Sequence, residues 1–580
     1  MAWYEEAIFY HIYPLGMLNA PKENHYDRIE HRLKELDDWI PHIKAIGCNA
    51  IYIGPLFESV GHGYETTDYK KLDSRLGDND DLKHFVKECH KAGIRVIFDG
   101  VFNHTGRDFF AFKDIKENRE NSQYRDWYCN VNFCGNNEYN DGFSYDNWGG
   151  YNLLVKLNQR NGAVRDYISD VVRFWVSEFD VDGIRLDAAD VLDFDFMKML
   201  RYVADTVKED FWLMGEVIHG DYTRWVNENT LHSVTNYTLH KGLYSGHNDH
   251  NYFEIAHTVK RLNDMAGSRP GGLRLYNFTD NHDVERIITK LNNKANYYPV
   301  HILEYTLPGV PSIYYGSEFA IEGRKEKYSD DSLRPHLSYK DYANAVKENP
   351  HTAFIAALSN ARHACPALSY GDYKEVLLTN RQYAFTRNTQ DSTALIAVNN
   401  DENQACIHIS GVRDGEYVGA LLGKRLTVSS GSAAIEIPAN YGEIYIPESE
   451  YKMPEFKVIS EVKPDMTKPA DDKETEATKP ADDKEAETVK QDAGNETGAV
   501  KQDAGNETGA VKSDAGSETD CGKFAGIASR TDYDSMTIEE LQAAILAKMA
   551  ANGPVTEDMK RTVYENVYPD SLRNWVRSFR

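Results

Sequence analysis

The sequence carries little positive charge for its size. Its 65 Lys and Arg residues face 91 Asp and Glu residues, which leaves a formal net charge of −26 at pH 7. A nucleic-acid backbone or an anionic membrane surface repels such a chain. Long apolar runs are also missing, because no uncharged stretch approaches the roughly 18 residues of a membrane-spanning helix. We therefore expect neither nucleic acid nor membrane as a partner.

Cysteines are few and scattered. An odd number of thiols predicts reduced cysteines rather than a disulfide framework. Cys129 and Cys134 form a C-x4-C pair with no second pair, which argues against a zinc site. The first residues, MAWYEEAIFYHIYP, lack the basic and apolar regions of a secretory signal. These observations predict a cytoplasmic protein. The seven cysteines are at positions 48, 89, 129, 134, 365, 406 and 521.

Length and pattern predict several domains. A chain of 580 residues is too long for one hydrophobic core. Short apolar runs rich in Ile, Val and Tyr alternate with amphipathic stretches, and this alternation predicts parallel βαβ units. The expected strands lie at 8–13, 49–53 and 94–99, and the expected helices at 31–47, 80–93 and 164–179.

Later regions differ in character. After His104 the alternation stops for about sixty residues rich in Asn, Tyr, Gly and Asp, a length typical of an inserted functional subdomain. Short strand-like runs at 368–447 predict an antiparallel β domain. Residues 448–522 contain an acidic eleven-residue repeat with Pro and Gly, which predicts a disordered linker. Beyond it, Thr537 and Glu540 have capping-box spacing, so 523–580 reads as a small helical module.

Four short segments end their apolar runs on ionisable groups: FDGVFNH at 98–104, GIRLDAADV at 183–191, MGEVI at 214–218 and FTDNHDV at 278–284. Asp187 and Glu216 are 29 residues apart, about one βα unit. Carboxylates at the ends of successive strands converge on one face of a parallel barrel. Two carboxylates that face each other across a sugar are the requirement for glycoside hydrolysis.

These segments resemble those of the α-amylase superfamily of retaining α-glucan-active enzymes. Further likenesses are IFYHIYP at 8–14, GHGYETTDY at 61–69 and PGVPSIYYGSE at 308–318. LVKLN at 154–158 is similar to a motif of the neopullulanase and cyclomaltodextrinase branch, although the sequence as given begins at the first barrel strand, without that branch's N-terminal β domain. The resemblance implies a (β/α)8 TIM barrel with an inserted domain B and a C-terminal antiparallel β-sandwich.

The expected domain boundaries follow from the pattern and the resemblance together. The barrel takes 1–103 and 165–367, and domain B takes 104–164. The β-sandwich takes 368–447, the acidic repeat linker 448–522 and the helical module 523–580.

The resemblance also implies catalytic roles. Asp187 corresponds to the nucleophile, Glu216 to the general acid/base, and Asp283 to the residue that binds the 2- and 3-hydroxyls of the reacting glucose. On the residues alone, the carboxylate of Asp187 beside Arg185 stays ionised, as a nucleophile must, although a buried structural ion pair gives the same pattern.

Further residues are expected around the substrate. By resemblance, His104 and His282 donate hydrogen bonds to the reacting sugar, and Tyr64 stacks beneath it. Asp330 and Arg334 have the D-x-x-x-R spacing of a pair that binds the neighbouring glucose, and a surface ion pair is the alternative. Arg185 is also expected to bind substrate, and Asp99 is expected to support the site by orienting Arg185.

No redox or nucleotide cofactor is implied. Asn103 matches a residue that ligates calcium in many relatives. Asp190 and Val191, however, stand where calcium-dependent members often carry Lys-His. The sequence therefore requires no cofactor and leaves calcium open.

The leading interpretation is a retaining hydrolase that cleaves α-1,4 bonds of maltodextrins through a covalent glycosyl-Asp intermediate. A glucanotransferase or a trehalose-forming isomerase would use the same intermediate, and a non-catalytic glucan-binding or chaperone subunit is the alternative from another class. An α-glucan oligosaccharide is the expected substrate. The module at 523–580 is a candidate docking element for a protein or a glycogen-like particle.

Overall fold

The computed structural model describes residues 2–267, 272–327, 329–451 and 537–552, together with Lys560, Val563 and Val576. The chain forms two units, Met1–Ser460 with Tyr568–Asn574, and Glu461–Val567 with Trp575–Arg580. The expected repeat linker at 448–522 lies outside the described residues except for its first four positions.

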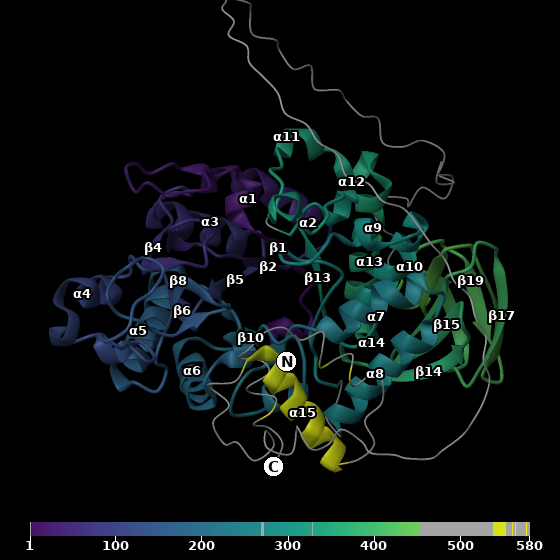
Figure 1. Cartoon of the computed structure of the whole chain (residues 1–580). Coiled ribbons are helices and arrows are strands. Elements are labelled where there is room, and N and C mark those ends of the chain that lie inside the picture. The colour runs from purple at the N-terminus through teal and green to yellow at the C-terminus, as the bar shows by residue number, and fades with distance from the viewer. Residues whose placement is uncertain are drawn as a thin grey trace, which may run out of the picture. The chain divides into compact units, whose positions relative to one another are not determined.

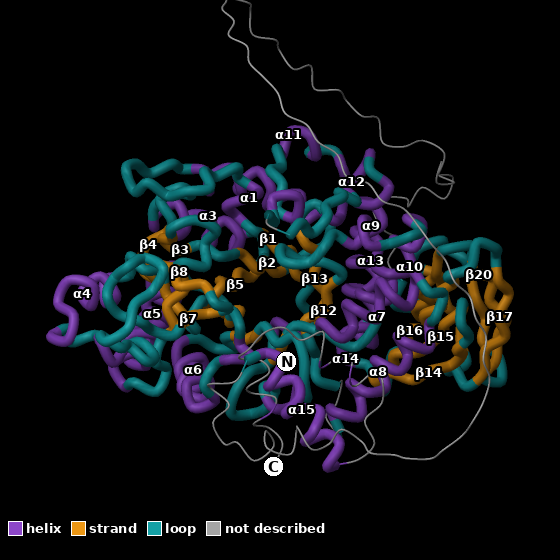
Figure 2. The backbone as a smooth tube through the Cα atoms, in the orientation of Figure 1, coloured by secondary structure: helices purple, strands orange, loops and turns teal. Residues whose placement is uncertain are grey.

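Eight parallel strands form a closed barrel (Figures 1 and 2). Their spatial order is β11-β10-β9-β5-β2-β1-β13-β12, and a parallel bridge between Thr235 and Tyr276 joins the two ends of this sheet. The barrel predicted from the sequence is thereby confirmed. Its strands are β1 (Phe9–Ile12), β2 (Ala50–Ile53), β5 (Arg95–Gly100), β9 (Gly183–Leu186), β10 (Trp212–Gly215), β11 (Ser233–Val234), β12 (Tyr276–Phe278) and β13 (Val310–Tyr314).

These strands are buried on both sides, as parallel strands covered by helices must be. Alternate side chains fill the barrel interior, where Phe9, Trp212 and Phe278 belong to one apolar cluster. Their neighbours Tyr10 and Leu213 pack instead into the large core that the surrounding helices share with the strands. The barrel interior is therefore filled with side chains, and a substrate can bind only at the ends of the barrel.

Helices surround the barrel (Figure 2). The single helix expected at 31–47 is wrong: the segment forms a 3-10 helix, η2 (Arg32–Trp39), followed by α2 (Ile40–Ala45). Pro41 is the reason, because it has no N–H to donate to the preceding turn and therefore begins a new helix. The other helices of the barrel region are α1 (Pro14–Met17), α3 (Asn79–Lys91), α5 (Gly162–Phe179), α6 (Phe194–Val207), α7 (Tyr237–Asn248), α8 (Tyr252–Ala266), α9 (Ile287–Lys290), α10 (Tyr297–Thr306), α11 (Tyr339–Tyr342), α12 (Ala345–Glu348), α13 (Pro350–Ala364) and α14 (Pro366–Tyr370).

Two small sheets extend the loops that follow β2 and β5. After β2, the strands β3 (Phe57–Ser59) and β4 (Thr66–Leu72) pair antiparallel. After β5, the inserted region contains α4 (Phe110–Asn118) and a three-stranded sheet in the order β6-β8-β7. Its strands are β6 (His104–Thr105), β7 (Asn147–Trp148) and β8 (Tyr151–Lys156).

The C-terminal β domain consists of two antiparallel sheets with a shared apolar core. Ala397 and Tyr445 of the larger sheet and Ile407 and Ile435 of the smaller one belong to that core. The larger sheet has the order β14-β15-β16-β21-β18-β19, and the smaller pairs β17 with β20. The strands are β14 (Asp372–Leu378), β15 (Gln382–Asn388), β16 (Thr393–Asn399), β17 (Ala405–Ser410), β18 (Gly415–Gly419), β19 (Arg425–Val428), β20 (Ser432–Ile437) and β21 (Tyr441–Pro447).

In the second unit, α15 (Ile538–Asn552) begins at the predicted capping box. The Glu540 amide donates to Thr537 Oγ1 at 3.3 Å, and the Thr537 amide donates to the Glu540 carboxylate at 2.9 Å. The rest of the helical module expected at 523–580 lies outside the described residues, apart from Lys560, Val563 and Val576. None of the described helices combines the length and the apolar composition that crossing a bilayer needs.

A buried carboxylate ties together the N-terminal end of the barrel. Asp182, which precedes β9, accepts hydrogen bonds from the Val96 amide at 2.9 Å and from Arg95 Nη1 at 2.9 Å. His90 Nε2 lies at 2.7 Å and Lys208 Nζ at 3.0 Å. Burial alone would raise the pKa of Asp182, but His90 and Lys208 lower it to about 2.

Replacing Asp182 with Asn should therefore destabilise the fold without touching the chemistry. A carboxyl whose pKa falls from 3.8 to about 2 on folding contributes roughly 2 kcal/mol above pH 4. That contribution disappears as the pH falls through about 2. The difference in unfolding free energy between wild type and Asp182→Asn should therefore become smaller in acid. Urea unfolding at several pH values measures it.

Asp180→Asn is the matched control, because the Asp180 side chain contacts the same His90 and Lys208 but is 68% exposed. It should change the unfolding free energy much less. Equal stability of Asp182→Asn and wild type at neutral pH would contradict this account.

Candidate active site

Strand register brings the predicted carboxylates together. Asp99 in β5 is the register partner of Arg185 in β9, and Leu186 is the partner of Gly215 in β10. Asp187 and Glu216 are therefore the first residues beyond two paired strand ends, and their side chains point to the same side. This is the C-terminal end of the barrel, where the loops after the strands build the active site in enzymes of this fold.

One buried guanidinium contacts three carboxylates. Arg185 Nη1 lies 2.8 Å from Asp99 Oδ1 and 2.9 Å from Asp187 Oδ1, and Nη2 lies 2.9 Å from Glu216 Oε2. Tyr52 donates a further hydrogen bond to Asp99 at 2.8 Å. Asp99 and Asp187 thus share Nη1 of Arg185, and Glu216 contacts Nη2.

The charge balance around Asp187 differs from a simple ion pair. Burial, together with the like charges of Glu216 and Asp99, raises the pKa of Asp187, and Arg185 acts in the opposite direction. The expectation that Arg185 alone keeps Asp187 ionised is too simple, because the guanidinium is shared. A proton on Glu216 removes one of the opposing charges and favours an ionised Asp187.

The Glu216 carboxylate has two further donors. The Ala188 amide donates to Oε2 at 3.0 Å, and the Tyr237 hydroxyl donates to Oε1 at 3.4 Å. Ala188 has a left-handed backbone (φ 45°, ψ 43°), which is uncommon for a residue other than glycine. Sequence reasoning missed Tyr237, because it begins α7 and no motif connects it to Glu216.

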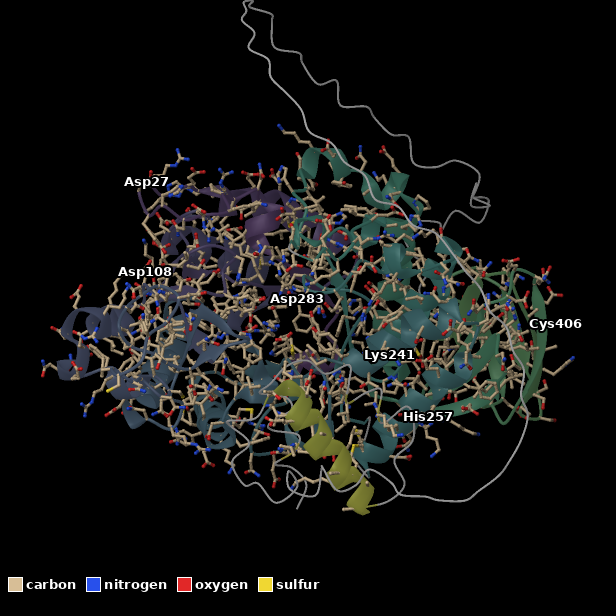
Figure 3. All side chains as sticks on the ribbon, viewed as in Figure 1. Asp27, Asp108, Lys241, His257, Asp283 and Cys406 are labelled. Atoms are coloured by element: carbon tan, nitrogen blue, oxygen red, sulfur yellow. The ribbon has the colours of Figure 1, made fainter. Side chains whose placement is uncertain are left out.

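Asp283 lies near the centre of the ring of strands (Figure 3). His282 Nε2 lies 3.0 Å from Asp283 Oδ2, and Arg334 Nη2 lies 3.0 Å from Oδ1. Burial acts to raise the pKa of Asp283, but His282 and Arg334 hold it well below its usual range. Asp283 is therefore ionised at neutral pH. Asp330 also contacts Arg334, at 3.3 Å, so the D-x-x-x-R pair forms.

Arg334 does more than pair with Asp330, because its side chain is only 12% exposed and reaches Asp283.

Aromatic rings surround the contact between Arg334 and Asp283. Tyr64 hydrogen-bonds to Asp99 at 3.3 Å and also contacts His282 Nε2, and its ring is nearly parallel to the His282 ring. Tyr13 lies parallel to His282 as well, at 5.8 Å between centroids. Tyr13 is part of the IFYHIYP segment, but nothing in the sequence pointed to this contact.

His104 lies slightly apart from the carboxylates. Its Nδ1 lies 3.2 Å from the side-chain amide nitrogen of Asn103. Burial lowers the pKa of His104 to about 3, so the ring is neutral at physiological pH. Its plane is parallel to that of Trp148, with centroids 6.5 Å apart.

The calcium question stays a prediction. Asn103 is buried, and its Oδ1 accepts a hydrogen bond from Gln159 at 3.5 Å. Within the described ranges, the group of three His, Cys, Asp or Glu side chains close enough to share an ion is His31, Asp78 and Asp81. Asp78 and Asp81 form the capping box of α3, and Asn103 is not among these residues.

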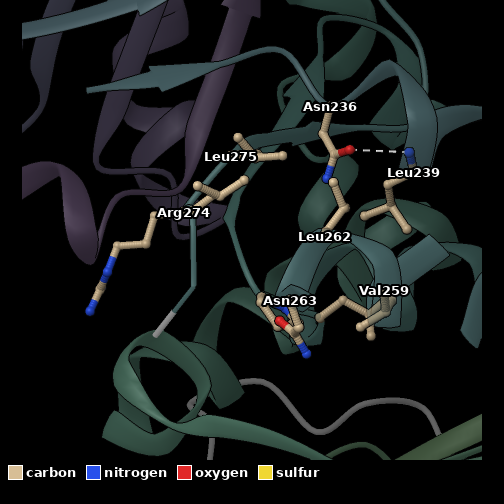
Figure 4. A pocket seen from close by; sticks show the side chains of 10 residues that line it. Asn236, Leu239, Val259, Leu262, Asn263, Arg274 and Leu275 are labelled. Carbon is tan, nitrogen blue, oxygen red and sulfur yellow. Dashed lines mark hydrogen bonds between the residues drawn. The ribbon is translucent and has the colours of Figure 1, made fainter. Parts of the chain in front are cut away.

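A separate pocket lies beside α7 and α8 (Figure 4). Its lining is mainly apolar, with Leu239, Val259, Leu262 and Leu275 among its residues, and it includes none of the carboxylates above. An apolar lining does not match the many hydroxyls of a sugar, so the chemistry belongs to the barrel mouth.

The catalytic domain of the α-amylase family matches residues 32–354, more than half of the chain. The chain belongs to the α-amylase family of glycoside hydrolases. A cyclomaltodextrinase of Bacillus sp. is 29% identical to this α-amylase family enzyme over 447 residues, which cover 73% of this chain and 77% of the relative. Neopullulanase 2 of Thermoactinomyces vulgaris is 29% identical over 69% of this chain and 70% of its own length. A solved cyclomaltodextrinase structure superposes with a TM-score of 0.67, at 25% identity over 76% of this chain and 78% of that one.

Proposed function

We propose that this α-amylase family enzyme hydrolyses α-1,4 bonds of maltodextrins with retention, through a covalent glycosyl-Asp187 intermediate. The observation that carries the proposal is the position of Asp187 and Glu216 on neighbouring nitrogens of one guanidinium. This arrangement favours the close carboxylate spacing of retaining enzymes, ~5–5.5 Å, over the wider spacing of inverting ones. The names of its relatives, cyclomaltodextrinase and neopullulanase, support an α-glucan substrate.

The reaction has two steps. Asp187 attacks the anomeric carbon while Glu216 gives its proton to the glycosidic oxygen, and the bond to the leaving sugar breaks. The departing sugar then leaves, and a water molecule takes its place. Glu216 removes a proton from that water, whose oxygen attacks the anomeric carbon and frees Asp187. Two inversions give net retention.

The surrounding residues hold the reacting sugar. Asp283 is ionised and fixed by His282 and Arg334, so it can accept hydrogen bonds from two sugar hydroxyls. Tyr64 supplies a ring beneath the sugar. Neutral His104 donates to it, and Asp330 contributes through Arg334 to the neighbouring glucose. These steps use no redox or nucleotide cofactor.

A cytoplasmic location is also proposed for the enzyme. The described cysteines support it, because all six are free thiols. The helical module, which contains the capped helix α15, is proposed to dock the enzyme on a protein or a glycogen-like particle.

Proton NMR of maltohexaose hydrolysis tests the proposed function. The wild type should release products whose new reducing ends are α-anomers in the first minutes, before mutarotation. Asp187→Asn should be slower by more than about 10³-fold, since it lacks the nucleophile. Early β-anomer would contradict retention. Oligomers longer than the substrate would identify a transferase, and conversion of maltose to a non-reducing disaccharide would identify the isomerase.

The pH dependence tests the charge arrangement. Asp187 must be ionised to attack, and its pKa is raised, so the acidic limb of kcat/KM should lie above the ordinary value of 3.8. Glu216→Gln carries the same charge as the protonated acid that acts in the first step, so it should leave that limb near its wild-type position. An aryl α-glucoside with a good leaving group needs no proton from Glu216 and keeps the rate measurable. A wild-type limb at or below the ordinary value, or a limb that moves by more than about one pH unit in Glu216→Gln, would contradict the account.

Truncation tests the docking role of the second unit. A chain that ends at Tyr451 should cleave maltohexaose at the wild-type rate, because every site residue lies before that position. Its sedimentation with glycogen, or its recovery of partner proteins, should fall. Unchanged results in both assays would contradict the docking proposal.

A further inference from the structure

The hairpin β7–β8 carries two aromatic side chains that the chemistry above does not use. Trp148 and Tyr151 are register partners on either side of a two-residue turn. The turn residues Gly149 and Gly150 have φ of +64° and +85°, the sign that the tightest hairpin turns require at both central positions. Directly paired residues of antiparallel strands lie on the same face, so the two rings share one side of the hairpin.

This hairpin is built onto the active site. Its strand β8 pairs with β6, and Lys156 is the register partner of His104. The ring of Trp148 is parallel to that of His104 within 7°, with 6.5 Å between centroids. The face that carries Trp148 and Tyr151 is therefore the face on which Trp148 approaches a proposed sugar-binding residue.

The hairpin is also held in one conformation. Asn147 Nδ2 donates to Asn152 Oδ1 at 2.8 Å, which clamps the two strands at the turn. Tyr145 donates to the Asn152 carbonyl at 2.8 Å from the buried side. A surface that is already ordered loses little conformational freedom when it binds a ligand.

Tyr151 is unusually exposed for a large ring. Its exposed fraction is 68%, the highest among the exposed large apolar side chains of the described residues. Its ring lies against the Gly149 backbone, where an added Cβ would be 3.3 Å from the ring. One side of the ring is thus backed by the turn, and Trp148 beside it is half-buried.

We propose that Trp148 and Tyr151 form a stacking platform for a glucosyl unit of the bound chain, outside the unit that reacts. A glucopyranose ring has apolar C–H faces that pack on aromatic rings, and its hydroxyls remain at the edge for solvent. The platform rests on the proposed function, and it makes the enzyme select longer maltooligosaccharides over substrates with a single glucose.

Kinetics on two substrates test the platform. Trp148→Ala and Tyr151→Ala should each lower kcat/KM for maltohexaose, the double variant by about tenfold, mainly through KM. For 4-nitrophenyl α-glucoside, which occupies only the reacting unit and the leaving-group side, kcat/KM should stay within about twofold of wild type. Trp148→Phe should keep most of the maltohexaose activity, because it keeps a stacking face.

Tyr202→Ala is the matched control, since Tyr202 is 66% exposed on α6 and outside the hairpin. It should leave both substrates unchanged. Equal losses on both substrates would show that Trp148 and Tyr151 act only by supporting His104, and no loss on maltohexaose would also overturn the platform.

The wild type separates the platform from the proposed function. If wild type does not cleave maltohexaose, the proposed function fails, and calorimetric titration of maltohexaose into wild type and the double variant then tests the platform alone. Binding weakened about tenfold in the double variant supports it, and equal binding overturns it. Thermal melts of every variant identify loss of folding, in which case Trp148→Phe and Tyr151→Ala carry the test.

Discussion

The contact on which the site depends is the sharing of one guanidinium by three carboxylates. Asp99, Asp187 and Glu216 all lie within hydrogen-bonding distance of Arg185, in a place where water is largely excluded. Three buried carboxylates without that cation would repel one another strongly. The shared cation holds Asp187 and Glu216 side by side, and Glu216 can give a proton to the substrate and take one back from water. General acid/base catalysis needs this transfer of a proton.

The two ends of the barrel differ in how far their buried acidic groups are balanced by cations. At the N-terminal end, Asp182 is surrounded by His90, Arg95 and Lys208, so its charge is fully compensated and stabilises the fold. At the C-terminal end, the acidic groups outnumber the cations in contact with them, so their charges remain responsive to substrate. A buried ion network serves stability in the first case and reactivity in the second.

Most of the barrel could be predicted from the sequence, because buried parallel strands leave continuous apolar runs. The proposed catalytic carboxylates could be named because the motifs that end those runs resemble those of the α-amylase family. Strands β18 and β19 could not be predicted individually, since GEYVG and RLTV have only five and four residues, too few for their pattern to stand out. The contacts of Tyr13, Tyr52 and Tyr237 were missed for another reason. They join segments far apart in the chain, and only the closed barrel brings the rings to Asp99, Glu216 and Arg334.

The most direct test of the account is to trap the covalent intermediate. A fluorinated α-glucosyl fluoride slows the second step more than the first, so the sugar should accumulate on the enzyme. Peptide mapping by mass spectrometry then locates it. The account predicts one added glucosyl group on the Asp187 side chain, absent in Asp187→Asn. A label on Glu216 or Asp283, or turnover of this reagent with inversion and no label, would contradict it.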